Sequence, residues 1–193
     1  MVRQRTIEAT SAFSDADDGA VVAREPTLPA QTMTALTPSL IADVREFFRA
    51  DYLPKIERCV DVLSEDDVWW RANDESNSIG NLLLHLDGST RKWILIVVAG
   101  RHIKRDRDAE FAERGPIPKS VLLARLRSTL AEVDGVLATL GAETLLERRQ
   151  SSKDEEVTVL WAVLHALEHF AMHTGQIILI TKLRTASVVR LSD

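Results

Sequence analysis

Three histidines recur at intervals of four residues near the end of the chain, in the segment HALEHFAMHTGQI over residues 165–177. In a helix, His165, His169 and His173 would lie along one side, since each step of four residues advances about 40° around the axis and about 6 Å along it. A histidine pair at i and i+4 can supply two ligands to a transition metal. The same side chains can instead fill a core, hydrogen-bonded to carbonyls, carboxylates or water.

A metal site needs at least one further ligand from another part of the chain. His85 is placed well inside another predicted helix, and Leu82, Ser89 and Ile96 share its stripe. We therefore expect His85 at the edge of an inward face. Alone it would be read as a hydrogen-bonded core residue, but opposite a histidine pair it becomes a candidate ligand. His102 belongs to a charged connection and is expected to be solvated.

A rival motif overlaps the same segment. His165-Ala-Leu-Glu168-His169 satisfies HxxEH, the inverted zinc-peptidase pattern, in which two histidines bind zinc and the glutamate is the general base. That interpretation predicts a metallohydrolase. However, three fixed positions recur by chance on histidine-rich helices, and no downstream segment offers the rest of a peptidase site. Glu168 is otherwise expected to accept a hydrogen bond from an imidazole N–H, or to be an exposed charge.

The elements that must position these residues are predicted to be helices. The chain has only 8 Gly and 6 Pro among 193 residues, and Leu, Ala, Glu and Arg dominate its middle and end. Thr37-Pro38 is predicted to begin the first helix, Ser78 to cap the second, and Pro54 to kink the first. The helix that carries the three histidines is apolar nearly all round and is expected to be mostly buried. The predicted helices cover residues 37–63, 78–100, 119–140 and 158–184, which together make an all-α bundle.

Length and composition set the outer limits of the prediction. We expect a flexible extension over residues 1–34 and one bundle domain over residues 35–193. The net charge of -5 argues against nucleic acid and anionic membranes as partners. A single cysteine, Cys59, excludes intrachain disulfides and is typical of core packing. Because the chain shows neither a signal peptide nor a membrane span, we expect a cytoplasmic protein.

Three stretches resemble the DinB/YfiT-like superfamily of metal-binding four-helix bundles: SIGNLLLHLDGSTRKWI at 78–94, RDRDAEF at 105–111 and HFAMHTGQIILITKL at 169–183. The resemblance extends from about Thr37 to Arg184. It implies an up-down-down-up four-helix bundle, in which one histidine of the second helix and a pair in the last helix bind a divalent metal. Matched residue by residue, the implied ligands are His85, His169 and His173.

Other residues near the implied ligands are candidates for supporting roles. The resemblance gives no ligand role to His165, so we expect His165, Glu168 and Gln176 to contact the ligands or line the pocket. In the charged connection, Arg105, Arg107 and Arg114 could bind a carboxylate of a thiol cofactor or an acidic substrate. We prefer the interpretation in which the acidic residues of the same stretch neutralise them; these are Asp106, Asp108, Glu110 and Glu113.

The resemblance also suggests a function. Some members of the superfamily are similar to thiol-dependent transferases or isomerases that use a low-molecular-weight thiol such as bacillithiol, mycothiol or glutathione. We therefore predict a metal-dependent thiol S-transferase or related detoxification enzyme, with a small-molecule substrate and a homodimer as a further expectation. Imidazole ligands suit several divalent ions, of which zinc or nickel is preferred here. The alternative is a metal-binding or stress-response protein without catalysis.

Overall fold

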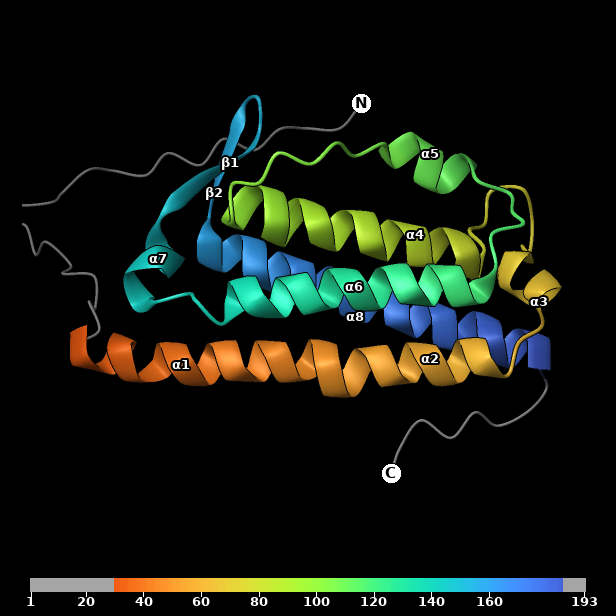
Figure 1. Ribbon diagram of the computed structural model, residues 1–193, viewed down its shortest axis with the longest axis horizontal. Coiled ribbons are helices and arrows are strands. Elements are labelled where there is room, and N and C mark those ends of the chain that lie inside the picture. The colour runs from red at the N-terminus through yellow and green to blue at the C-terminus, as the bar shows by residue number, and fades with distance from the viewer. Residues whose placement is uncertain (1–29, 186–193) are drawn as a thin grey trace, which may run out of the picture.

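Four long helical segments lie side by side and make up most of residues 30–185, the part of the chain that the computed structural model describes (Figure 1). The first and last segments run in one direction and the middle two run in the other, which confirms the predicted all-α, up-down-down-up bundle. In chain order the elements are α1 (Ala30–Glu46), a π-helical segment (Phe47–Tyr52), α2 (Leu53–Asp61), α3 (Glu65–Trp69), α4 (Ile79–Thr90), a second π-helical segment (Arg91–Val98), α5 (Arg107–Ala112), α6 (Lys119–Leu137), α7 (Ala142–Leu146), β1 (Arg148–Ser152), β2 (Glu155–Thr158) and α8 (Val159–Thr185).

The first helix begins earlier than predicted. α1 begins at Ala30, so Thr37-Pro38 does not start the helix and Pro38 lies inside it. An interior proline removes one helical hydrogen bond. A threonine-proline pair can stand at the first turn of a helix or inside it, and the sequence alone does not distinguish the two. The predicted start of the first helix was therefore wrong. Most of the extension predicted over residues 1–34 falls on residues 1–29, outside the described residues, while residues 30–34 belong to the helix.

Where the sequence predicted a kink before Pro54, the structure has a change of helix type. Residues Phe47–Tyr52 are π-helical, and the Leu53 N–H donates to the Phe48 carbonyl five residues back. Pro54 then lies in the first turn of α2, directly after this π-helical segment. The first bundle segment therefore continues through the proline as a π-helical stretch followed by a new α-helical start.

The helix α4 begins where the sequence predicted. The Ser78 hydroxyl accepts from the Asn81 N–H at 3.1 Å, and the Asn81 carboxamide oxygen accepts from the Ser78 N–H at 3.2 Å. This reciprocal cap satisfies N–H groups that the first turn leaves without helical partners. Because α4 packs against α6, α8 and α5 together, nearly all of its side chains are buried. The helix continues as a π-helical segment and stops before Gly100, which has a φ of 67°.

The long connection between the second and third bundle segments returns along the whole length of the bundle (Figure 1). This path is required because α4 and α6 run in the same direction, so the chain must travel back before α6 can begin. The connection contains a short helix, α5, which the sequence did not predict and which packs on α4. The Asn81 side chain holds α5 by donating to the carbonyls of Glu110 at 2.9 Å and Glu113 at 3.0 Å.

A short helix and a hairpin, neither of which was predicted, join the third and fourth bundle segments. After α7, strands β1 and β2 pair antiparallel, with Arg148 opposite Thr158 and Arg149 opposite Val157, and with an irregularity between Gln150 and Ser152. Most of the hairpin side chains are exposed, so it shows little of the apolar alternation by which a strand is recognised. The hairpin leads directly into α8.

The last helix, α8, contributes Phe170 and Ile177 to the core, both fully buried. The expectation that α8 is mostly buried was wrong for one side: a row of large apolar side chains is about half exposed, namely Trp161, Leu164, Met172, Leu179 and Leu183. An apolar residue can lie on the surface of a folded protein, so hydrophobicity alone does not establish burial. Within residues 30–185, no helix has the combined length and hydropathy needed to cross a bilayer.

Candidate metal centre

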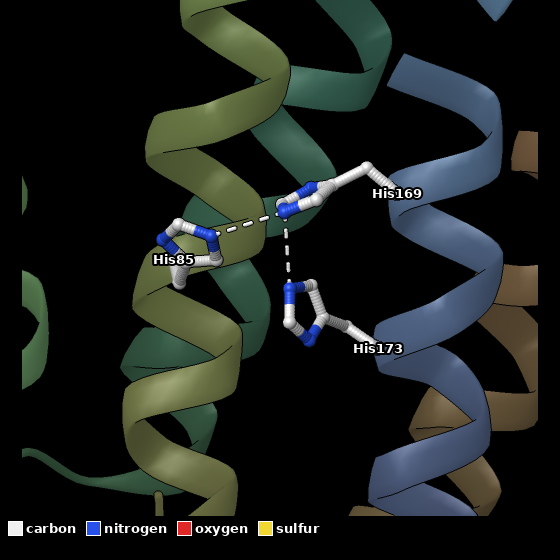
Figure 2. Close-up of side chains that lie close together, drawn as sticks. All are labelled: His85, His169 and His173. Carbon is white, nitrogen blue, oxygen red and sulfur yellow. Dashed lines mark hydrogen bonds between the residues drawn. The ribbon is translucent and has the colours of Figure 1, made fainter. Parts of the chain in front are cut away.

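Three histidine side chains from two helices meet between α4 and α8 (Figure 2). The Nε2 atom of His169 lies 3.2 Å from Nε2 of His85 and 3.1 Å from Nε2 of His173. One nitrogen from each ring falls within a group whose members are all within 4.8 Å of one another. His85 is 5% exposed and His173 is 8% exposed, so the group is largely shielded from solvent. The structure therefore brings together the three residues that the resemblance implied as ligands.

Core packing on both helices fixes this meeting point. On α4, His85 follows three consecutive buried leucines, which press the helix against its neighbours. On α8, Phe170 lies beside His169 in the chain and packs into the core, edge-on to Phe48 with ring centroids 5.2 Å apart. Because residues four apart share one face of a helix, fixing α8 in this orientation turns His169 and His173 toward α4 together.

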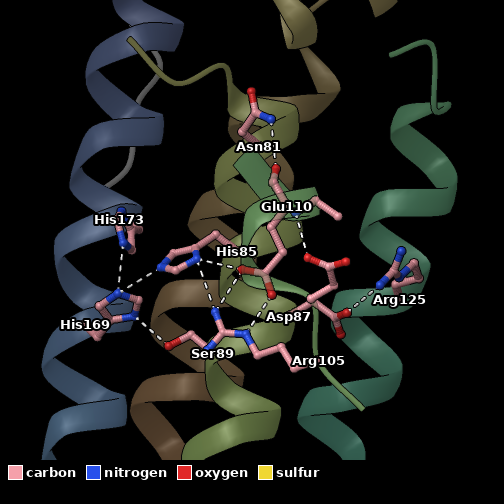
Figure 3. Close-up of polar contacts among 11 residues, drawn as sticks. Asn81, His85, Asp87, Ser89, Arg105, Glu110, Arg125, His169 and His173 are labelled. Atoms are coloured by element: carbon pink, nitrogen blue, oxygen red, sulfur yellow. Dashed lines mark hydrogen bonds and ion pairs between the residues drawn. The ribbon is translucent and has the colours of Figure 1, made fainter. Parts of the chain in front are cut away.

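The outer nitrogens of two rings each have an acceptor oxygen as their nearest polar contact. His85 Nδ1 lies 2.9 Å from Glu110 Oε2, which is closer than its 3.3 Å to Arg105 Nη2, a donor (Figure 3). His173 Nδ1 lies 2.6 Å from Gln176 Oε1. A carboxylate and an amide carbonyl accept, so both imidazoles donate through Nδ1–H. In a neutral imidazole the other nitrogen then carries a lone pair. In their neutral form, the His85 and His173 rings therefore present inward Nε2 lone pairs, which is what a metal requires.

His169 lies between the other two rings, and its Nε2 atom faces a ring nitrogen on each side. The Ser89 hydroxyl lies 3.2 Å from His169 Nδ1 and can accept from it, which leaves the His169 Nε2 lone pair facing two others. If the proton were on Nε2 instead, it could be directed fully at only one of the two neighbouring nitrogens. In either tautomer, unshared electron pairs oppose each other at 3.1–3.2 Å. A cation between the three nitrogens would resolve this repulsion.

A proton is a poor candidate for that cation at neutral pH. Burial, together with the neighbouring His173 and His85, lowers the pKa of His169 to about 3. Burial also lowers the pKa of His173, against the effect of its hydrogen bond with Gln176. Both imidazoles are therefore neutral near pH 7, so protons compete little for the lone pairs. The chemistry of the group favours a metal ion over an extra proton.

The two separations from His169 Nε2 to the other inward nitrogens fit a transition metal. Two nitrogens each about 2.0–2.1 Å from a tetrahedral zinc ion lie about 3.3 Å apart. The observed 3.1 and 3.2 Å are within a few tenths of an ångström of that value. Three imidazoles from two helices, with outer hydrogen bonds that orient the rings, resemble the usual arrangement of a histidine metal site.

A mostly buried ion pair supports the His85 ring from the connection. Arg105 donates to both oxygens of Glu110, through Nε at 2.7 Å and Nη2 at 2.8 Å, and the same carboxylate accepts from His85 (Figure 3). Burial alone would raise the pKa of Glu110, but the hydrogen bonds from Arg105 and His85 bring that pKa below its ordinary value. The carboxylate next to the ligand is therefore ionised at neutral pH.

The remaining histidine candidates lie outside the group of facing nitrogens. His165 stacks on Trp161 with ring centroids 4.7 Å apart and also contacts Trp93. Glu168, the general base of the HxxEH interpretation, has a side chain that is 77% exposed and lies 3.9 Å from His165 Nδ1. His102 is exposed in the connection, as expected. The geometry gives His165 an aromatic environment and leaves Glu168 directed at solvent.

From the sequence we expected Glu110 to neutralise a nearby arginine, and its contact with the candidate ligand His85 was not predicted. A signal was present, because Glu110 belongs to the RDRDAEF stretch that carries part of the resemblance. Ser89 was also recoverable, since it follows His85 by four residues and so shares its helix face. Of the three arginines, Arg105 is neutralised by Glu110, Arg107 lies over the Phe111 ring, and Arg114 donates to backbone carbonyls.

Comparison with solved structures identifies the class of fold. The chain is similar to a crystal structure of a DinB-like protein, YjoA, from Bacillus subtilis, with a TM-score of 0.55 and 16% sequence identity. The match covers 73% of this chain and 91% of that one. At this identity the likeness establishes the DinB-like fold, and the function of the relative does not transfer.

A family model gives a more specific placement. The chain belongs to the family described as "Protein of unknown function (DUF1572)", whose model matches residues 37–191. This DinB-like family agrees with the resemblance found in the sequence. A search of curated proteins finds no match to the chain.

Proposed function

We propose that this protein is a divalent-metal-dependent enzyme that joins a low-molecular-weight thiol to an electrophilic small molecule. The observation that carries the proposal is the convergence of three histidine nitrogens whose outer nitrogens each face a hydrogen-bond partner. The DinB-like fold supports the metal site. The reaction class rests on the superfamily resemblance, because one fold can host many reactions.

His85, His169 and His173 would hold the ion, with zinc or nickel as the preferred occupant. Three protein ligands leave at least one coordination position for a water molecule or a substrate. An ion bound by neutral imidazoles keeps its full positive charge and lowers the pKa of a thiol or water beside it. Glu110 and Gln176 would orient the rings, and the surrounding burial would limit the entry of bulk water.

The reacting thiol must come from outside the chain. Cys59 is fully buried in the core, and burial raises the pKa of its thiol, so it is neither accessible nor readily ionised. In the proposed reaction, the sulfur of the external thiol bonds to an electrophilic carbon. The leaving group departs with the electron pair of its broken bond, and the thiol proton passes to solvent.

Turnover by purified protein tests this function. Tag-free protein loaded with zinc or nickel would be mixed with glutathione or bacillithiol and a chlorodinitroarene, and formation of the thioether followed by its absorbance. We expect turnover in the parent and its loss in His85→Ala. His102→Ala is the matched control, because that histidine is exposed in the connection and should leave turnover unchanged.

Two other outcomes would redirect the proposal. Metal bound near one equivalent, with thiol consumption no faster than with free metal, would support a metal-binding protein without catalysis. Metal-dependent peptide hydrolysis that required His165 and Glu168 would support the metallohydrolase alternative. The exposure of the Glu168 side chain argues against that second outcome.

A further inference from the structure

Gly88 lies inside α4, about one turn after His85, although glycine is a poor helix former. A methyl group at this position would overlap Glu110 Oε1, and it would lie 2.8 Å from Glu110 Cδ and 3.0 Å from Arg105 Nε. Real Cβ atoms essentially never approach other groups as closely as 2.8 Å. The space above Gly88 is therefore taken by the ion pair that supports the metal centre.

The ion pair needs this space to reach its target. Glu110 belongs to α5 and His85 to α4, and the carboxylate must cross the surface of α4 to contact His85 Nδ1 (Figure 3). The side chains of Glu110 and Arg105 are 10% and 16% exposed, so they lie pressed between the connection and the helix. A glycine at this point of α4 allows the two charged groups to lie directly against the helix backbone.

The backbone of α5 has little freedom to retreat from an added methyl group. The Glu110 carbonyl accepts from the Asn81 side chain at 2.9 Å, and the Phe111 carbonyl accepts from Arg71 at 3.3 Å. Asn81 is itself fixed by the cap of α4. With the α5 backbone held on both sides, a clash at position 88 would be relieved chiefly by moving the Glu110 side chain away from His85.

We propose that Gly88 is a positioning residue for the metal centre, because its missing side chain lets the Glu110–Arg105 pair lie against α4 and hold His85 through Nδ1. The inference rests on the proposed metal site. Loss of a carboxylate that orients a histidine ligand typically weakens metal binding about 10–100-fold. Gly88→Ala should therefore weaken zinc binding about tenfold or more, although alanine is the better helix former.

A double-mutant cycle tests the role. Zinc affinity would be measured by chelator competition for the parent, Gly88→Ala, Glu110→Ala and the double variant. Each single change should weaken binding, and the double variant should bind no more weakly than Glu110→Ala, because the methyl group then has no carboxylate to displace. Gly135→Ala is the matched control: Gly135 also lies inside a helix, with nothing within 4 Å of an added Cβ, and should bind zinc as the parent does.

A metal-free readout separates this inference from the proposed function. Hydrogen exchange of the backbone amides in residues 105–113 should be faster in metal-free Gly88→Ala than in the parent or in Gly135→Ala. If the parent binds no zinc, the proposed function fails. Faster exchange in Gly88→Ala than in the parent would still support the packing of the Glu110 side chain against Gly88. Parent-like exchange in Gly88→Ala would overturn the inference, and so would a parent-like zinc affinity of that variant. The inference would also fail if the double variant lost zinc affinity by the product of the two single-variant losses. Should Gly88→Ala fail to fold, Glu110→Ala alone tests the contact, and unchanged zinc binding there would also overturn it.

Discussion

Two carboxylates at α4, the buried one of Asp87 and the mostly buried one of Glu110, should respond differently to loss of charge. Glu110 contacts His85, whereas Asp87 accepts from Thr129 at 2.5 Å and from Arg125 at 2.8 Å, on the side of α4 that faces α6. Glu110→Gln keeps an acceptor oxygen but removes the charge that makes His85 a stronger ligand. We expect zinc affinity to fall about 10–100-fold, equivalent to about 1.4–2.7 kcal/mol.

The matched change Asp87→Asn should affect stability instead. Thr129 is fully buried, and an asparagine oxygen can still accept from its hydroxyl, but the hydrogen bond is no longer charge-assisted and is therefore weaker. The Arg125 side chain is 52% exposed, so its lost ion pair adds little. The free energy of unfolding should therefore fall by about 1–2 kcal/mol, in the lower part of the range for a disrupted buried hydrogen bond.

Chelator competition for zinc affinity and urea unfolding of metal-free protein measure the two effects. Asp87→Asn should keep zinc affinity within about twofold of the parent, because its side chain has no contact with the ligand group. If Glu110→Gln binds zinc as tightly as Asp87→Asn does, then the contact between Glu110 and His85 does not support the metal centre and the reasoning is refuted.

Two further predictions concern pH and the core. The folded-state pKa of His169, about 3, lies below its ordinary 6.5, so the unfolded chain takes up the proton first as pH falls. Metal-free protein should therefore lose stability between pH 6.5 and pH 3, and urea unfolding at pH 7 and pH 5 should show a smaller loss in His169→Asn; an equal loss would contradict the assignment. Phe170→Ala should lower the free energy of unfolding by about 3–5 kcal/mol, because this fully buried ring packs beside the ligand pair. A loss below about 1 kcal/mol by urea unfolding would show that the core tolerates its removal.

The helices of the bundle could be predicted because their signals are local. Ser78 and Asn81 form the expected cap, Gly100 ends the second bundle segment, and α8 occupies the range that its apolar residues indicated. The start of α1 could not be placed, because Pro38 is compatible with either a first turn or an interior position. The hairpin after α7 was missed because its strands are short and mostly exposed.

The candidate site was predictable to the extent that it follows helix periodicity. His169 and His173 share a face through their spacing, and the resemblance pointed to His85 as their partner across the bundle. The RDRDAEF stretch marked the region of Glu110, but its contact with His85 depends on how the connection folds back over α4, which is a long-range feature. The role of Gly88 is similarly hidden, since a glycine within a helix gains meaning only when the group that lies against it is known.

Elemental analysis of tag-free protein, run beside His169→Ala, is the most direct test of the metal centre. His169 is the right position to change because its Nε2 atom faces both other rings. We expect close to one equivalent of a divalent transition metal in the parent, whether as purified or after reconstitution, and its loss in the variant. Parent protein that takes up no metal even after reconstitution would contradict the account and leave three histidines whose role is structural.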